Sequence, residues 1–239
     1  MLYAKNLVLN KLFNLIIILL AVTFTFVGCG DGVSNKTEGV IEYKVTYPKM
    51  EKDNFMRDFM PDKMHVKFKD NTYSNSLSAG MGMFKSSFIC NKSNSEYIQI
   101  VKLINKKYAL KLDGDGIAKS MASKPAYTIE FTDEVKEIIG YHCNKAIVNV
   151  NNEAQDAFTV YYTDKINIET PNWCNEYVEI PGVLLEYQYE KYGVCMRFTA
   201  SKIEFKKVDD EEFLLPTGYT LISEPEMDKE MQEIFDSFK

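Results

Sequence analysis

Five cysteines and two histidines are the residues best suited to chemistry in this sequence, and their spacing favours anchoring over catalysis. His65 stands between Met64 and Val66 in an alternating segment, which is typical of a strand face in contact with water. His142 and Cys143 are adjacent, and adjacent residues of a strand point to opposite faces, so they predict no Cys–His nucleophile. No cysteine belongs to a CxxC motif or to a Cys/His cluster with metal spacing. We therefore expect no metal ion, no cofactor and no enzymatic activity.

Cys29 ends an N-terminal apolar run and is expected to carry a lipid. Two lysines precede the run at 12–27, which is short for a transmembrane helix and has the form of a signal peptide. The small residues before Cys29 resemble a bacterial lipobox, in which the thiol is acylated and the signal is removed. An uncleaved helix with an incidental cysteine is the alternative. We expect a lipoprotein signal peptide at 1–28, a lipidated tether at 29–39 and membrane anchoring through several acyl chains.

The other four cysteines are an even set, which favours disulfides in an exported chain. They are Cys90, Cys143, Cys174 and Cys195. Three pairings are possible and the sequence does not choose among them. Buried free thiols are the alternative.

The net charge argues against a nucleic-acid partner, and the residues that follow Asp113 argue against a calcium site. The net charge of −6 becomes −8 when the two N-terminal lysines leave with the signal, and no basic block compensates locally. Asp113 opens an Asp-Gly-Asp-Gly segment, but an EF-hand would need Gly at position 118 and Glu at position 124. Those positions hold Ala and Lys, so a turn explains the segment better.

Alternation of apolar and polar residues dominates the chain from residue 40 and predicts a mainly β protein. The alternating segments lie at 40–47, 64–70, 83–90, 96–104, 106–112, 126–131, 143–150, 157–163, 183–190 and 194–208. About ten short strands with few helices favour an antiparallel meander. We expect a single domain at 40–239.

Three segments have helical rather than alternating spacing. The Met-rich segment at 50–60 places five large apolar residues on one helical face: Met50, Phe55, Met56, Phe59 and Met60. A shorter helix is expected at 115–123. A C-terminal helix is expected at about 225–238, with an apolar stripe of Met227, Met231, Ile234 and Phe238.

Three further stretches carry a family resemblance: IIGYHCNKAIVNV at 138–150, FTVYYTDKINI at 158–168 and EIPGVLLEYQ at 179–188. Their order and spacing resemble a family of Gram-negative envelope lipoproteins of unknown function related to the GLPGLI proteins. The resemblance covers roughly residues 38–238. It implies a LolA/LolB-like fold, in which a curved antiparallel sheet forms an incomplete barrel with one or two covering helices.

Together, the lipobox and the resemblance lead to a functional expectation. We expect a non-enzymatic, membrane-anchored lipoprotein that binds an apolar or amphipathic ligand, such as a lipid, a lipopeptide or an acyl chain. Its expected location is the envelope of a Gram-negative bacterium, at the outer membrane facing the periplasm. One alternative is a structural or adaptor lipoprotein that docks an envelope protein and has no ligand cavity. An enzyme with an unrecognised site is a more distant third.

Candidate ligand-lining residues come from the Met-rich segment and from the strand at 183–190. They are Met56, Phe59 and Met60 from the first, with Leu184, Tyr187 and Tyr189 from the second. Strand alternation places Tyr187 and Tyr189 on one face of the strand and Leu184 on the opposite face. At most one of these two faces is therefore expected to line a pocket. For the Met-rich face, a plug that fills the core of the sheet is favoured over a lid that faces a ligand.

Overall fold

The computed structural model describes residues 37–236 except 52, 83 and 152–155, all within one compact unit that spans Asn35–Lys239. The strands are β1 (Glu38–Thr46), β2 (Lys63–Lys69), β3 (Thr72–Ala79), β4 (Phe84–Asn91), β5 (Glu96–Leu103), β6 (Lys106–Leu112), β7 (Tyr127–Ile138), β8 (Tyr141–Val150), β9 (Ala157–Thr163), β10 (Val183–Lys191), β11 (Val194–Glu204) and β12 (Thr220–Leu221). The helices are α2 (Gly114–Ala122) and α3 (Glu224–Asp236), with 3₁₀ turns η2 (Phe55–Phe59), η3 (Gly80–Gly82) and η4 (Asp210–Phe213). The expected signal peptide at 1–28 and Cys29 lie outside the described residues.

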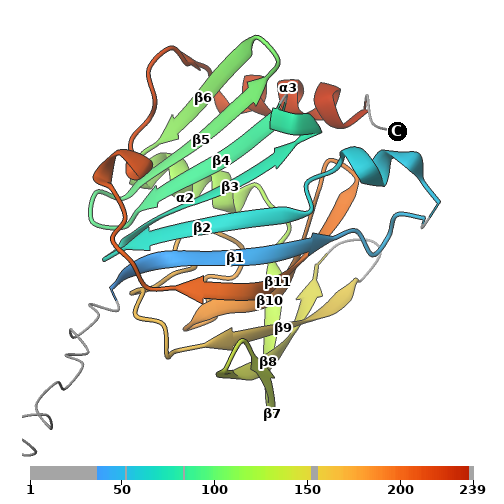
Figure 1. Cartoon of the computed structure of the whole chain (residues 1–239), viewed down its shortest axis with the longest axis vertical. Coiled ribbons are helices and arrows are strands. Elements are labelled where there is room, and N and C mark those ends of the chain that lie inside the picture. The colour runs from blue at the N-terminus through green and yellow to red at the C-terminus, as the bar shows by residue number, and fades with distance from the viewer. Residues whose placement is uncertain (1–36, 52, 83, 152–155, 237–239) are drawn as a thin grey trace, which may run out of the picture. The chain divides into compact units, whose positions relative to one another are not determined.

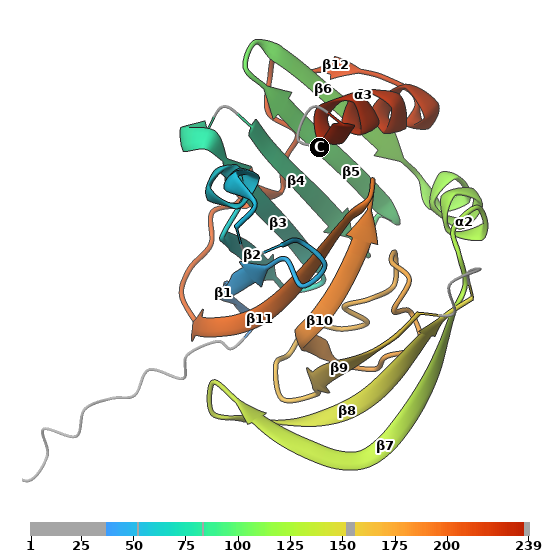
Figure 2. The same cartoon turned by 90° about the vertical axis from the view of Figure 1, so that its right-hand side faces the viewer.

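All twelve strands belong to one open sheet, in the order β12-β6-β5-β4-β3-β2-β1-β11-β10-β9-β8-β7 (Figure 1). Every neighbouring pair is antiparallel except β12 and β6. The sheet curves strongly, with β7, β8 and β9 bending round toward the side on which α3 lies (Figure 2). The predicted mainly β class, with a curved antiparallel sheet and few helices, is confirmed.

The sheet consists of two meanders joined at one seam. Strands β1 to β6 pair in sequence order, and so do β7 to β11. The two meanders meet where β1 pairs with β11, with Val40 opposite Glu204 at one end and Thr46 opposite Arg197 at the other. The chain passes from one meander to the other through α2, which lies between β6 and β7 in sequence (Figure 2).

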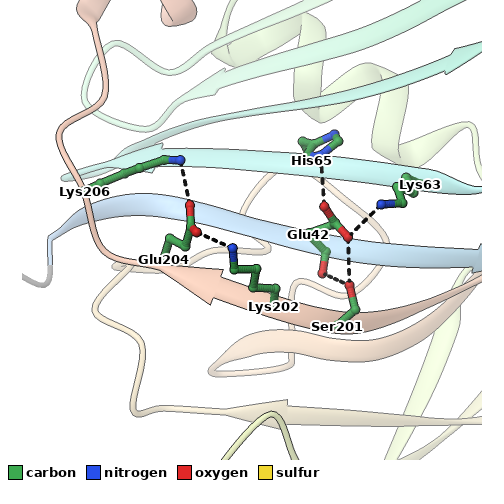
Figure 3. A network of polar contacts seen from close by, with 7 residues as sticks. All are labelled: Glu42, Lys63, His65, Ser201, Lys202, Glu204 and Lys206. Atoms are coloured by element: carbon green, nitrogen blue, oxygen red, sulfur yellow. Dashed lines mark hydrogen bonds and ion pairs between the residues drawn. The ribbon is translucent and has the colours of Figure 1, made fainter.

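The alternation seen in the sequence separates a buried face from a wet face in β1. Ile41, Tyr43 and Val45 are all at most 4% exposed. Glu42, between them, points outward and contacts Lys63 at 3.2 Å and His65 at 3.4 Å (Figure 3). These exposed pairs bridge neighbouring strands but contribute little to stability individually.

A second set of outward charges follows along the same face. Glu204 accepts hydrogen bonds from the ammonium groups of Lys202 and Lys206 (Figure 3). These two bonds lower the pKa of Glu204 to about 2. The placement of His65 on this face agrees with its expected contact with water.

Both faces of the sheet are partly covered by the C-terminal segment. On the outer face, Phe213, Leu215 and Tyr219 pack against a buried cluster of Ile89, Ile98 and Ile100. On the inner face, α3 buries four residues at helical spacing: Met227, Met231, Ile234 and Phe235. Three of these were predicted from the apolar stripe, whereas Phe238 lies outside the described residues.

The helix expected at 50–60 is wrong in the described part of that segment, which forms only the 3₁₀ turn η2. Phe55 is 73% exposed and Phe59 is 52% exposed, so the aromatic residues do not form a buried stripe. A helix this short depends on packing of its apolar face, and that packing is missing here. Met60, which follows the turn, is buried.

Other differences from the predicted elements have local causes. The strand β3 was missed because TYSNSLSA carries small polar residues on both faces. Strand β7 extends beyond the predicted 126–131 through a register shift between Phe131 and Val135. The Asp-Gly segment at 113 caps α2, since the Asp113 side chain accepts a hydrogen bond from the Gly116 amide at 2.9 Å.

Among the described residues no helix has the length and apolar content needed to cross a bilayer.

Gly182 lies immediately before β10, at a point where no side chain fits. A Cβ atom at this position would lie 2.5 Å from the Thr163 carbonyl oxygen on β9. Backbone atoms of a paired strand cannot move aside as a flexible side chain can. Close approach of the two strands therefore requires glycine here.

We predict that Gly182→Ala lowers the free energy of unfolding by about 2 kcal/mol, because the added methyl group overpacks a backbone contact. Denaturant titration of the purified chain measures the change. Gly114→Ala is the matched control, since its Cβ would meet the nearest atom at an ordinary 3.5 Å, on Ser95. Equal effects of the two substitutions would contradict this account.

Candidate functional site

A cavity of about 240 Å³ lies on the inner side of the curved sheet. Its walls come from both meanders, from α2 and α3, and from residues 164–182 between β9 and β10, which we call the inner loop. Most of its lining is apolar or aromatic, for example Tyr43, Met64, Leu77, Tyr187, Tyr189 and Phe198. A curved sheet cannot bury its whole concave face on itself, so these covering elements complete the enclosure.

The residues proposed from the sequence are partly brought together at this cavity. Phe59, Met60, Tyr187 and Tyr189 all border it. The side chain of Met56 lies outside what the structure describes. Whether any of these residues contacts a ligand stays a prediction.

The expectation that Leu184 is excluded when Tyr187 and Tyr189 line the pocket is wrong, because Leu184 borders the same cavity. The register between β10 and β9 shifts between Leu184 and Glu186. A bulge of this kind changes which face the following residues occupy. Parity counted along an uninterrupted strand therefore fails at this point.

Aromatic rings meet at the centre of the cavity wall. Tyr187 stacks on Phe198 with centroids 4.9 Å apart and meets Tyr43 and Tyr177 edge-on at 6.0 and 5.9 Å. The Tyr43 hydroxyl donates to the Leu184 carbonyl at 2.8 Å, and the Tyr177 hydroxyl donates to the Gln188 carbonyl. Burial raises the pKa of the Tyr43, Tyr177 and Tyr187 hydroxyls. These groups therefore stay neutral and act as hydrogen-bond donors in an apolar wall.

The inner loop is held by one buried side-chain amide. Asn172 is 5% exposed, and its Nδ2 donates to the carbonyl oxygens of Ile180 and Gly182, both at 2.9 Å. It thereby ties the middle of the loop to the loop's C-terminal end, just before β10. Two residues after Asn172, Cys174 packs against Cys90 of β4.

A polar mouth adjoins the apolar cavity. This second space, of about 380 Å³, shares six lining residues with the first: Lys124, Glu176, Tyr189, Lys191, Glu224 and Asp228. Its remaining lining includes two further carboxylates, Asp156 and Glu190. Carboxylates outnumber lysines here, so the mouth is net negative at neutral pH.

Specific pairs fix the charges of the mouth. Lys124 contacts Glu176 at 3.0 Å, and Lys191 contacts Asp228 at 2.9 Å. Partial burial alone would raise the pKa of Asp228, but the Tyr192 hydroxyl, which donates at 2.6 Å, and the Lys191 ammonium bring it below its ordinary value. Asp228 and Lys191 are 48% and 34% exposed at their side chains, which places this pair in contact with solvent.

The other candidate reactive groups are dispersed or neutralised. All four described cysteines are buried free thiols, and burial raises the pKa of Cys143 and of Cys195 to about 11. Burial would raise the pKa of Glu186, but Lys136 at 2.6 Å and Arg197 hold it below its usual range. Within the described part of the chain, no group of three or more His, Cys, Asp or Glu residues could hold a metal ion.

A family model described as "N-glycanase peptide, N-terminal domain" matches residues 72–209, which is more than half of the chain. The chain belongs to this family. The match begins at β3 and ends just before η4, so it contains the inner loop and most of the cavity wall. No curated protein matches the sequence.

This match corrects the resemblance to GLPGLI-related, LolA/LolB-like envelope lipoproteins. The stretches at 138–150, 158–168 and 179–188 form β8, β9 and the start of β10 with its glycine turn. Such motifs describe antiparallel strands and turns, which unrelated sheets share. By its description, a domain of the matched family is the N-terminal part of an N-glycanase, and thus occurs within an enzyme.

Several important residues of the site escaped sequence reasoning. The inner loop does not alternate, so it yielded no element, and its Asn172 and Tyr177 carried no motif. The single tryptophan beside Cys174 was the strongest local signal of a buried segment. The contact of this loop with β4 is visible only in three dimensions.

We predict that Asn172→Asp lowers the free energy of unfolding by about 2 kcal/mol, because a carboxylate cannot donate to the two buried carbonyls that the amide satisfies. Denaturant titration at neutral pH measures the loss.

Asn175→Asp, in the same loop, is the matched control. The Asn175 Oδ1 atom accepts from the Tyr177 amide at 2.9 Å, and a carboxylate preserves that role. We expect a change below about 0.5 kcal/mol for this control. A control variant as unstable as Asn172→Asp would show that charge alone, and not the lost donors, disturbs the loop.

Proposed function

We propose that this chain is a membrane-anchored envelope lipoprotein whose domain binds an amphipathic ligand on the inner side of its sheet. The observation that carries the proposal is the junction of an apolar, aromatic cavity with a polar mouth through six shared residues. The apolar part of the ligand would occupy the first space and its polar group the second. The first cavity alone is smaller than the roughly 300 Å³ usual for ligand sites, and the two spaces together fall within the usual range.

The apolar cavity favours a lipid, an acyl chain or a lipopeptide. Transfer of apolar surface from water into such a site is favourable by roughly 25 cal/mol per Å². The net negative mouth favours a polar group that is neutral or cationic, or one that donates hydrogen bonds to carboxylates. Cys29, with the apolar run before it, supports anchoring in a membrane, and we place the protein at the outer membrane facing the periplasm.

We infer a binding role and not a catalytic one for the domain itself. The buried tyrosines are held neutral, and the carboxylate of Glu186 is engaged by two cations. A general acid or base needs a pKa close to the working pH, and these groups are shifted away from it.

A glycan is a second candidate ligand, and the family match favours it. The mouth combines carboxylates with the aromatic residues Tyr127, Phe158 and Tyr189. Carboxylates accept hydrogen bonds from sugar hydroxyls, and aromatic rings provide flat apolar surfaces beside them. In this case the domain would present glycans without cleaving them.

We predict that Ser86→Phe weakens binding of decylamine, an apolar chain with a cationic headgroup, at least tenfold, because Ser86 is 6% exposed and lines the cavity that the new ring would fill. Isothermal titration of the purified full chain in mild detergent measures the affinity. Mass spectrometry after solvent extraction identifies any apolar molecule that copurifies.

Ser78→Phe is the matched control, since Ser78 is exposed on β3 and lies outside the cavity lining. It should leave decylamine affinity unchanged. If N-linked oligosaccharides released from a glycoprotein bind and decylamine does not, the glycan candidate replaces the lipid. If neither binds and nothing copurifies, the domain is better explained as an adaptor for an envelope protein.

A further inference from the structure

Two buried cysteines from distant parts of the chain meet beside the cavity. Cys90 ends the inner face of β4, and Cys174 lies in the inner loop, 84 residues later. Their Sγ atoms are 3.1 Å apart, and the residues are 3% and 7% exposed. Ile117 of α2 completes the small cluster that encloses them.

The surroundings of the two sulfur atoms differ. The contact with Cys90 lowers the pKa of Cys174, helped by the Tyr73 hydroxyl at 3.4 Å and by the Lys124 ammonium, against the effect of burial. Burial, with the adjacent Cys174, raises the pKa of Cys90. In the packed loop Cys174 is therefore the more readily ionised thiol of the pair.

We propose that Cys90 and Cys174 form a disulfide that fastens the inner loop to β4 and fixes the wall of the cavity. The Sγ atoms of these two residues are already in contact, and only a small approach of the sulfur atoms is needed to reach bonding distance. The cross-link goes beyond the proposed ligand binding and does not depend on it.

The oxidant is a disulfide donor, either a thiol–disulfide oxidoreductase or a small disulfide such as oxidised glutathione. The thiolate of one of the two cysteines attacks one donor sulfur, forming a mixed disulfide and releasing the first donor thiolate. The thiolate of the other cysteine then attacks the cysteine sulfur of the mixed disulfide and releases the second donor thiolate. Two protons leave the cysteines and two electrons reduce the donor. Since both sulfur atoms are buried in the finished fold, the exchange occurs while the inner loop is still unpacked.

The other two described cysteines do not make an equivalent pair. Cys143 belongs to β8 and Cys195 to β11, with β9 and β10 between these strands. Three strand spacings of roughly 4.8 Å separate them by about 14 Å along the sheet, beyond the reach of a disulfide. They provide internal controls for the specificity of the cross-link.

The test is disulfide mapping of the full chain in a Cys29→Ser background, which leaves the four described cysteines. The protein is unfolded, refolded in detergent with oxidised and reduced glutathione, alkylated at acidic pH and digested without reduction. Mass spectrometry should find the Cys90 and Cys174 peptides joined, with a mass lower by two hydrogen atoms than the sum of the reduced peptides. Cys143 and Cys195 should be alkylated.

Reduction should lower the Tm of the cross-linked protein by about 5 °C or more, because it releases a long closed loop. Cys143→Ser should retain both the cross-link and this shift, whereas Cys174→Ser should abolish both and leave Cys90 alkylated. Free thiols at all four positions after refolding, or a bond from either residue to Cys143 or Cys195, would overturn the proposal.

Discussion

The pairing of β1 with β11 is the contact on which the rest of this sheet depends. Every other antiparallel neighbour is also a neighbour in sequence, so each meander forms by pairing of consecutive strands. The β1–β11 seam joins residues about 160 positions apart, such as Val40 and Glu204. Gly39 permits the approach, since a Cβ there would lie 2.5 Å from the Glu204 carbonyl oxygen. Because the loop that this seam closes is so long, we expect it to form late in folding.

Once the seam is closed, the inner side of the curved sheet has more concave surface than its own side chains can fill. The α3 helix bridges the two meanders from above, with Phe235 against Phe84 of β4 and Tyr192 beyond β10. The inner loop enters from the opposite meander and reaches β3 and β4 through Cys174. The cavity is the space that these two covers leave. Tyr43 and Tyr177 satisfy their hydroxyl groups on backbone carbonyls, which lets these two polar side chains lie in an apolar wall.

The fold class could be predicted from the sequence because alternation of apolar and polar residues is a local property, and β1 shows it without interruption. Prediction failed where the three-dimensional context decides. The Met-rich segment has helical spacing, yet Phe55 and Phe59 find no surface to pack against and remain exposed. The bulge in β10 moved Leu184 onto the cavity, which no count of odd and even positions anticipates. Likewise, four cysteines allow three pairings, and the approach of the inner loop to β4 depends on contacts far apart in sequence.

The inner loop links the stability of the domain to the shape of its ligand site. Glu176, Tyr177 and Cys174 all border the apolar cavity, and Glu176 also lines the mouth. Asn172 ties the middle of the loop to the loop's own C-terminal end just before β10, while Cys174, two residues further on, contacts Cys90 of β4. Loosening either tie would free cavity-lining side chains at the same time. A site whose wall is tethered at two points pays less ordering entropy when a ligand binds. The same tethers that complete the core therefore preorganise the space in which we place the ligand.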